Sequence, residues 1–154
     1  MSNPSTLAPL FTRAAEIAAA FRGRLADRPV RPDDDAAAAL ARFSMPLPDG
    51  PTDPAEVLAE LAGLAEPGIA GSAGPRFFGF VNGGALPAAS AADILVTGWD
   101  HPAFNTVLSP AGAAAERVAG DWIKEILDLP AHATVGFTTG AQAANVVGIA
   151  AARH

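Results

Sequence analysis

The chain has 154 residues, of which 50% are hydrophobic and 17% charged, against about 25% charged residues in a typical soluble domain. Its 10 basic and 16 acidic residues give a formal net charge of −6, and no basic cluster is present, which excludes the electrostatic surface that binds nucleic acid. The absence of cysteine excludes disulfides, thiolate metal sites and thiol nucleophiles.

The amino-terminal residues carry no targeting signal, because no basic region there precedes an apolar one. No uninterrupted apolar run reaches the roughly 20 residues that a membrane helix requires. We therefore expect a cytoplasmic protein that does not bind membranes. The low charge content predicts that a second protein surface covers part of this one.

The first half of the chain predicts helices and no chemistry. Apolar residues recur at spacings of three and four over residues 10–25, which is typical of an amphipathic helix lying against a partner surface. Prolines then leave room for one short helix at about residues 33–41. An acidic N-cap at Asp53, followed by proline and then glutamate, predicts a helix over residues 54–66.

A loop rich in glycine and phenylalanine follows, over residues 68–84. Phenylalanines flanked by glycines are typical of core residues at a turn. Alternatively, Asn82 could offer both a donor and an acceptor to a ligand, with Phe77, Phe78 and Phe80 beside it.

The next predicted helix covers residues 87–97, and the clearest one begins at Ser109 and ends before Pro130. One face of this later helix is apolar and the other is charged. Lys124, the only lysine, lies on the charged face near Glu125 and Asp128, where we expect it to be hydrated and ion-paired. It is therefore a poor candidate for a covalent bond to a carbonyl cofactor.

The carboxyl-terminal region predicts a buried strand over residues 134–138 and an apolar, buried helix over residues 141–153. This order is the beginning of an α/β layer. No acidic residue follows Leu129, and the start of the last helix combines free backbone N–H groups with hydroxyls and the Gln142 amide, which suits a phosphate. Alternatively, Thr138 or Thr139 only caps a buried helix.

The three histidines, at positions 101, 132 and 154, are too widely spaced to predict a metal site. Asp100 and His101 are sequence neighbours, and neighbouring side chains usually point apart.

Three segments, in order, resemble the group II pyridoxal-phosphate-dependent amino-acid decarboxylases, the family of the aromatic amino-acid and glutamate decarboxylases. They are GPRFFGFVNGG at 74–84, the Leu108-Ser109-Pro110 start of a helix with Glu116 and Trp122, and the stretch at 136–153 that includes GFTTGAQAAN. With the spacing between them, they cover about residues 54–154.

The resemblance implies an α/β protein of fold type I, an obligate homodimer that uses pyridoxal 5′-phosphate and acts on an amino acid. Residues 1–67 would form a helical segment that embraces the partner subunit. Residues 68–110 would supply substrate-pocket loops and a helix, and residues 111–154 would begin the large cofactor-binding domain.

The resemblance also implies roles for individual residues, but it implies no catalytic residue and no metal ligand within the chain. The residues that would bind the cofactor phosphate are Thr139, Gly140, Ala141, Gln142 and Asn145. Those that would line the substrate pocket are Phe80, Val81, Asn82, Pro102 and Phe104. The family often has glycine followed by a small or hydroxyl residue where this chain has Ala141-Gln142, so a hydroxyl contact would be replaced by an amide or lost.

The function implied is that of the amino-terminal portion of a carboxy-lyase, inactive alone because the cofactor-bonding lysine of the family lies beyond His154. Two alternatives stay open. One is a non-catalytic helical interaction module. The other is part of a different fold type I enzyme, an aminotransferase or another lyase.

Overall fold

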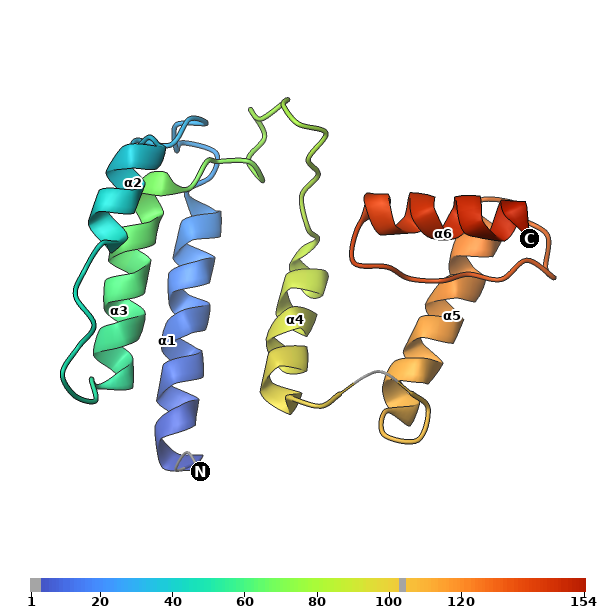
Figure 1. Ribbon diagram of the computed structural model, residues 1–154, viewed down its shortest axis with the longest axis horizontal. Helices are drawn as coiled ribbons and strands as arrows, with labels where there is room; N and C mark the ends of the chain where they lie inside the picture. Colours follow the sequence, from blue (N-terminus) through green and yellow to red (C-terminus); the bar gives the residue numbers. More distant parts are fainter. Residues whose placement is uncertain (1–3, 103–104) are drawn as a thin grey trace. The chain divides into compact units, whose positions relative to one another are not determined.

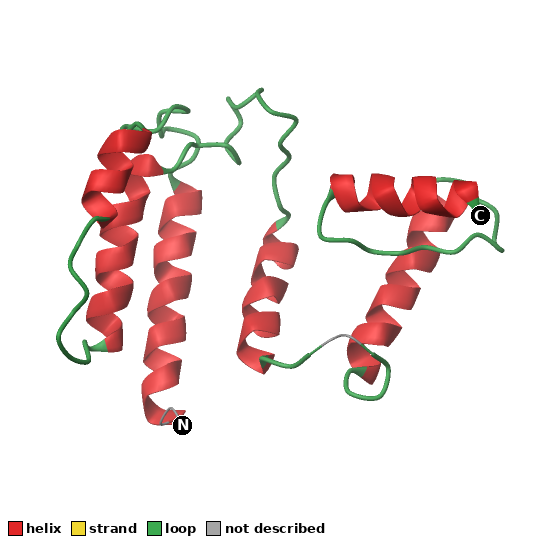
Figure 2. Ribbon diagram, in the orientation of Figure 1, coloured by secondary structure: helices red, strands yellow, loops and turns green. Residues whose placement is uncertain are grey.

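A computed structural model describes residues 4–102 and 105–154, which form six α-helices, one short 3-10 helix and no strand (Figures 1 and 2). The chain divides into two compact units, Met1–Leu95 and Val96–His154. The helices are α1 (Pro4–Gly23), α2 (Ala36–Phe43), α3 (Pro54–Ala65), the 3-10 helix η1 (Glu66–Gly68), α4 (Pro87–Trp99), α5 (Pro110–Ile126) and α6 (Ala141–Arg153). Within the described residues, no helix combines the length and apolar character that a bilayer crossing requires.

The first unit is built on contacts among α1, α2, α3 and η1. Figure 1 shows α1 and α3 side by side and running in the same direction. Ile17 and Ala20 of α1 line a shared hollow with Ala59 and Ala62 of α3, so part of the predicted apolar face meets its own chain. Leu25, just after α1, is 6% exposed and is the single buried hydrophobic side chain among the described residues.

Side-chain caps fix where several helices begin. The Asp53 carboxylate accepts hydrogen bonds from the backbone N–H groups of Ala55 (2.8 Å) and Glu56 (3.4 Å), which confirms the predicted start of α3. In α2, Asp35 is the cap, and the helix begins three residues later than predicted. The N–H groups of Asp33 and Asp34 donate instead to the Pro67 carbonyl, which ties this connection to η1.

The end of α5 shows why the helix stops before Pro130. The Leu129 N–H donates to the Lys124 carbonyl (2.9 Å) and the Asp128 N–H to the Glu125 carbonyl (3.2 Å), the pattern of a Schellman motif. Asp128 has a φ of 52°, in the left-handed region that aspartate tolerates better than most residues. The helix therefore ends at Ile126, through local hydrogen bonds and not through the proline.

The apolar face of α5 is not the face that the rest of the chain covers. Gly120 is buried, and a Cβ added there would lie 3.2 Å from the Val135 Cβ, so the following chain packs closely against this side of the helix. The apolar side chains are left largely exposed: Val118 at 45%, Trp122 at 64% and Ile126 at 79%.

The strand predicted at residues 134–138 is absent, and this part of the prediction is wrong. Residues 133–138 form an irregular segment. A β-strand is stabilised by hydrogen bonds to a neighbouring strand, and the described residues contain none. The helix α6 forms with the predicted bounds, but it is not buried: Val146 is 67% exposed and Ile149 is 71% exposed.

Candidate functional site

The start of α6 exposes backbone N–H groups that no described side chain caps. The first helical hydrogen bond runs from the Ala144 N–H to the Gly140 carbonyl (3.1 Å), which leaves the preceding N–H groups of the first turn directed out of the helix. The Thr138 hydroxyl donates to the same Gly140 carbonyl (3.0 Å) and does not accept from the helix. Within the described residues, therefore, neither Thr138 nor Thr139 caps α6.

The chemistry around this helix start suits an anion. The helix dipole places about half a positive charge at the N-terminus, and the sequence contributes no carboxylate after Asp128. Thr139 and Gly140 precede the first turn, Ala141 begins it, and Gln142 and Asn145 follow on exposed positions. Hydroxyl, amide and backbone donors are therefore present on the solvent-exposed residues around this helix start.

The first residue of α6 differs from that of several other helices in the chain. Helices α3, α4 and α5 each begin with proline, which has no N–H to donate. Helix α6 begins with Ala141, which keeps its N–H, and Gly140 before it is extended, with φ 161° and ψ 164°. The N–H at this position is therefore available to a ligand.

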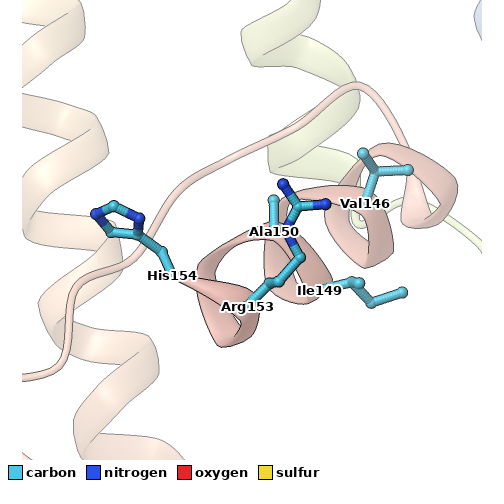
Figure 3. Close-up of a pocket in the computed structure, with 5 residues that line it drawn as sticks. All are labelled: Val146, Ile149, Ala150, Arg153 and His154. Atoms are coloured by element: carbon cyan, nitrogen blue, oxygen red, sulfur yellow. The ribbon is translucent and has the colours of Figure 1, made fainter.

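A hollow of about 560 Å³ lies along the later turns of α6 (Figure 3). All its labelled lining residues come from this helix and the residue after it: Val146, Ile149, Ala150, Arg153 and His154. Its lining is mostly aliphatic and includes none of the predicted phosphate-binding residues. The hollow is therefore a surface feature separate from the helix start.

The predicted substrate residues Phe80, Val81 and Asn82 form an exposed turn in the first unit. The Asn82 N–H faces the Gly79 carbonyl at 3.4 Å, and both central residues have positive φ, 58° at Phe80 and 57° at Val81. Phe80 is 91% exposed and Val81 105% exposed. Phe80 is therefore not a core residue of the described chain, and that interpretation is wrong for this phenylalanine. Its ring does stack on that of half-buried Phe77, with the ring centres 6.5 Å apart.

The backbone of this turn is strained. Two consecutive positive φ angles are the mark of a type I′ turn, which normally carries Gly, Asn or Asp at both central positions. A β-branched residue such as Val81 is a true outlier there. Each such residue costs about 1–3 kcal/mol and persists where the surrounding structure holds it. This turn could not be predicted from the sequence, because Phe-Val is a poor match to a type I′ turn.

Of the other two predicted substrate residues, Pro102 is exposed in the second unit and Phe104 lies outside the described residues. Pro102 therefore belongs to a different compact unit from Phe80, Val81 and Asn82. The predicted phosphate-binding residues are in the second unit as well.

A histidine–serine contact that the sequence did not predict lies next to Pro102. His101 Nε2 is 2.8 Å from the Ser109 hydroxyl, which also accepts a hydrogen bond from the Gly112 N–H as the N-cap of α5. Ser109 is 2% exposed, and the Trp99 and His101 rings meet edge to face, with their centres 6.4 Å apart. Because the serine oxygen is buried and already shared, this pair stabilises the start of α5 and is not placed as a nucleophile.

Lys124 is not hydrated as predicted. Its side chain is 15% exposed, and its ammonium group donates to the Ala131 carbonyl (3.1 Å) and pairs with Asp121 (2.9 Å), not with Glu125 or Asp128. The hydrogen bond from Lys124, and then its charge, lower the pKa of the Asp121 carboxyl. Both contacts occupy the amine, which is therefore not placed to attack a carbonyl.

Comparison with known proteins gives two partial matches. Over 83 residues the chain is 32% identical to phenylacetaldehyde synthase of a Rosa hybrid cultivar, a match that covers 52% of this chain and 16% of the relative. Over 89 residues it is 33% identical to tryptophan decarboxylase 1 of Oryza sativa subsp. japonica, covering 58% of this chain and 17% of the relative. No protein-family model matches.

These matches confirm a distant similarity to the group II aromatic amino-acid decarboxylases. The similarity covers part of the chain only, and the matched region spans about one sixth of the length of each relative.

Proposed function

We propose that this chain is a portion of a pyridoxal-phosphate-dependent amino-acid decarboxylase of fold type I, which contributes residues that bind the cofactor phosphate and residues that select the substrate. The observation that carries the proposal is the uncapped start of α6, in a chain with partial similarity to decarboxylases. The chain would have three segments. The first, residues 1–67, would embrace the partner subunit; the second, residues 68–110, would form part of the substrate pocket; and the third, residues 111–154, would begin the cofactor domain.

The residues at the start of α6 fit a phosphate monoester. The N–H groups of Ala141 and Gln142 and the Gln142 amide would hold its oxygens, while Thr139, Gly140 and Asn145 would shape the turn around them. The nearest preceding acid, Asp128, belongs to the cap of α5. Ala141-Gln142 replaces the smaller or hydroxyl-bearing residues that the family often has there, so amide contacts would take the place of a hydroxyl.

The substrate side would consist of Phe80, Val81, Asn82 and Pro102, together with Phe104. The exposure of Phe80 and Val81 supports this role, because large apolar side chains that no described residue covers are suited to meet a ligand or a partner subunit. The turn presents an apolar surface with one amide, which would favour a hydrophobic or aromatic amino-acid side chain.

When bound, pyridoxal phosphate supplies the electron sink for loss of carbon dioxide from the amino acid. The part played by this chain would be to anchor the cofactor phosphate and to select the substrate, because its only lysine, Lys124, is engaged with Asp121 and Ala131. We therefore expect these 154 residues alone to be inactive, and the active protein to be a homodimer in which other segments provide the reacting amine.

The test uses the protein encoded by the longest reading frame that contains these 154 residues. Ala141→Pro removes one backbone N–H at the first helical position, which tolerates proline, and should weaken pyridoxal phosphate binding about tenfold or more. Ala36→Pro makes the same change at the start of α2 and should leave binding unchanged. Equal affinity in both variants would contradict the assignment of the phosphate site.

Activity is measured as release of carbon dioxide and, separately, of aldehyde from L-tryptophan and L-phenylalanine. The aldehyde assay addresses the alternative of another fold type I lyase, which the name of the Rosa relative favours. Carbon dioxide without aldehyde supports the decarboxylase.

The exposed apolar side chains of α5 and α6 favour a second candidate, a non-catalytic helical interaction module. A folded protein that binds no pyridoxal phosphate and shows neither activity would support this candidate over the enzyme.

A further inference from the structure

The loop that leads to the Phe80–Asn82 turn lies directly on the chain that follows α1. The Gly71 N–H donates to the Val30 carbonyl (3.0 Å), and the Arg76 guanidinium donates to the Arg28 carbonyl (2.7 Å). A Cβ added at Gly74 would lie 2.9 Å from the Leu25 carbonyl oxygen, so only glycine allows this approach. We call residues 25–30 the loop seat.

The side chain of Arg28 joins the loop seat to the beginning of the same loop. Its guanidinium donates to the Glu66 carboxylate (2.9 Å), the Glu66 carbonyl (2.6 Å) and the Ile69 carbonyl (3.4 Å). The group also lies 5.0 Å from the centre of the Phe21 ring, a cation–π contact, and the side chain is 14% exposed. This planar group satisfies several acceptors at once, which a lysine ammonium cannot reproduce.

Arg24 provides an internal comparison. It pairs with the same Glu66 carboxylate at 3.0 Å, but its other side-chain hydrogen bond is to the Ala20 carbonyl of the preceding helix α1, and its side chain is 60% exposed. Arg24 thus links the end of α1 to η1 without reaching the loop. Arg28 reaches the loop twice, at Ile69 through its side chain and at Arg76 through its own carbonyl.

These contacts give a source for the constraint that the strained turn needs. Phe80 and Val81 are almost fully exposed, so side-chain packing around Val81 does not hold its positive φ. Two other features hold the turn. One is the preceding part of the loop, which backbone hydrogen bonds fix on the loop seat, and the other is the stacking of Phe77 on Phe80. Strained residues persist only where the neighbouring structure fixes them.

We propose that Arg28 is a positioning residue for the Phe80–Asn82 turn, which it orients without touching the substrate. The inference rests on the proposed function for the role of the turn in substrate selection. The geometric part, that Arg28 fixes the loop, stands independently of any activity.

The first experiment measures amide hydrogen exchange in the purified protein encoded by the longest reading frame that contains these residues. Arg28→Lys keeps the charge but loses the simultaneous bonds to Glu66 and Ile69, and exchange in residues 70–82 should accelerate about tenfold or more. Arg24→Lys, the matched control, should leave these residues unchanged. Equal protection of residues 70–82 in the two variants would overturn the proposal, as would a loss of protection in α1 and α3 as large as that in the loop.

Arg76→Met serves as a second variant in case Arg28→Lys does not fold. It removes the donor to the Arg28 carbonyl while leaving the Arg28 side chain and its helix contacts in place. Faster exchange confined to residues 70–82 supports the seat, and unchanged exchange there contradicts it.

The second experiment compares substrates in the protein encoded by the longest reading frame. Arg28→Lys should change the ratio of kcat/KM for L-tryptophan to that for L-phenylalanine by about fivefold, because a displaced turn alters pocket shape. Arg24→Lys should change this ratio less than about twofold. A uniform loss for both substrates would indicate a structural role and overturn positioning. If the unaltered protein decarboxylates neither amino acid, the proposed function fails, and hydrogen exchange alone decides whether Arg28 fixes the turn.

Discussion

The two compact units use their amphipathic helices differently. In Met1–Leu95, hydrophobic residues of α1 face α3. Beyond the ends of these two helices, Arg24 and Arg28 form ion pairs with Glu66. In Val96–His154, the charged side of α5 is covered by its own chain at Lys124, whereas Trp122 and Ile126 face outward. An apolar pattern therefore predicts that a surface will be covered, but not that the same chain will cover it.

The largest expected effect comes from the exposed apolar surface of the second unit. We expect the purified 154-residue protein to bind a hydrophobic dye and to self-associate or stay partly molten. Val146→Lys with Ile149→Lys should weaken self-association about tenfold or more, because two exposed aliphatic side chains become charged. Ala37→Lys with Ala88→Lys, on exposed positions of the first unit, should have little effect. A monomer with one cooperative thermal transition would contradict the expected self-association or partial folding.

The next effect tests the close packing of the first unit. Gly74→Ala places a methyl group 2.9 Å from the Leu25 carbonyl oxygen and 3.1 Å from that of Gly71. Displacing the loop should lower local stability by about 1–3 kcal/mol, measured by hydrogen exchange at Gly71 and Phe77. Gly83→Ala, where the added atom meets nothing within 4 Å, is the control and should change exchange little. Equal effects of the two substitutions would show that the loop is not held on the seat.

Helix caps offer a smaller contrast between the units. Ser109→Ala removes the cap of α5 and the contact with His101, and should cost about 0.5–2 kcal/mol of local stability. The change is followed by tryptophan fluorescence, since both tryptophans lie in the second unit. Asp53→Ala removes an exposed cap in the first unit and should cost less, as measured by hydrogen exchange in α3. A larger cost at Asp53 would reverse the expected ranking.

The smallest effect concerns pH and the Lys124–Asp121 pair. Because the folded-state pKa of Asp121 is lowered, the pair stabilises the protein above the ordinary aspartate pKa of about 3.9, and this contribution is lost as pH falls through the lowered value. Asp121→Asn should remove that part of the acid dependence and leave stability near neutral pH slightly reduced. Tryptophan fluorescence during acid titration checks this. An identical acid dependence in the variant would show that the pair contributes nothing measurable.

The sequence predicted helices well where the signal is local. The acidic cap at Asp53 and the serine cap at Ser109 set the starts of α3 and α5, and α6 has the predicted bounds. The strand at residues 134–138 was predicted from apolar content, but strand formation depends on a neighbour that the local sequence does not specify. The same limit explains the exposure of α6, since burial depends on other surfaces.

Some parts of the candidate site could also be predicted from the sequence, and others could not. Residues 139–145 could be singled out from sequence, because the absence of acids and the start of a helix are readable along the chain. The contact of Arg28 with Glu66 and Ile69 could not, because it joins residues about forty positions apart. The strained turn at Phe80 and Val81 was also hidden, because its residues are ones that normally avoid positive φ.

By itself, then, the sequence determined the helices with local caps and the absence of acidic side chains around the start of α6, because capping, periodicity and charge act between near neighbours. Only the tertiary structure decided that Lys124 is enclosed while Trp122 is exposed, and that Arg28 fixes the loop before the Phe80–Asn82 turn. These features depend on contacts between distant segments, and their geometry follows from packing, not from the order of residues.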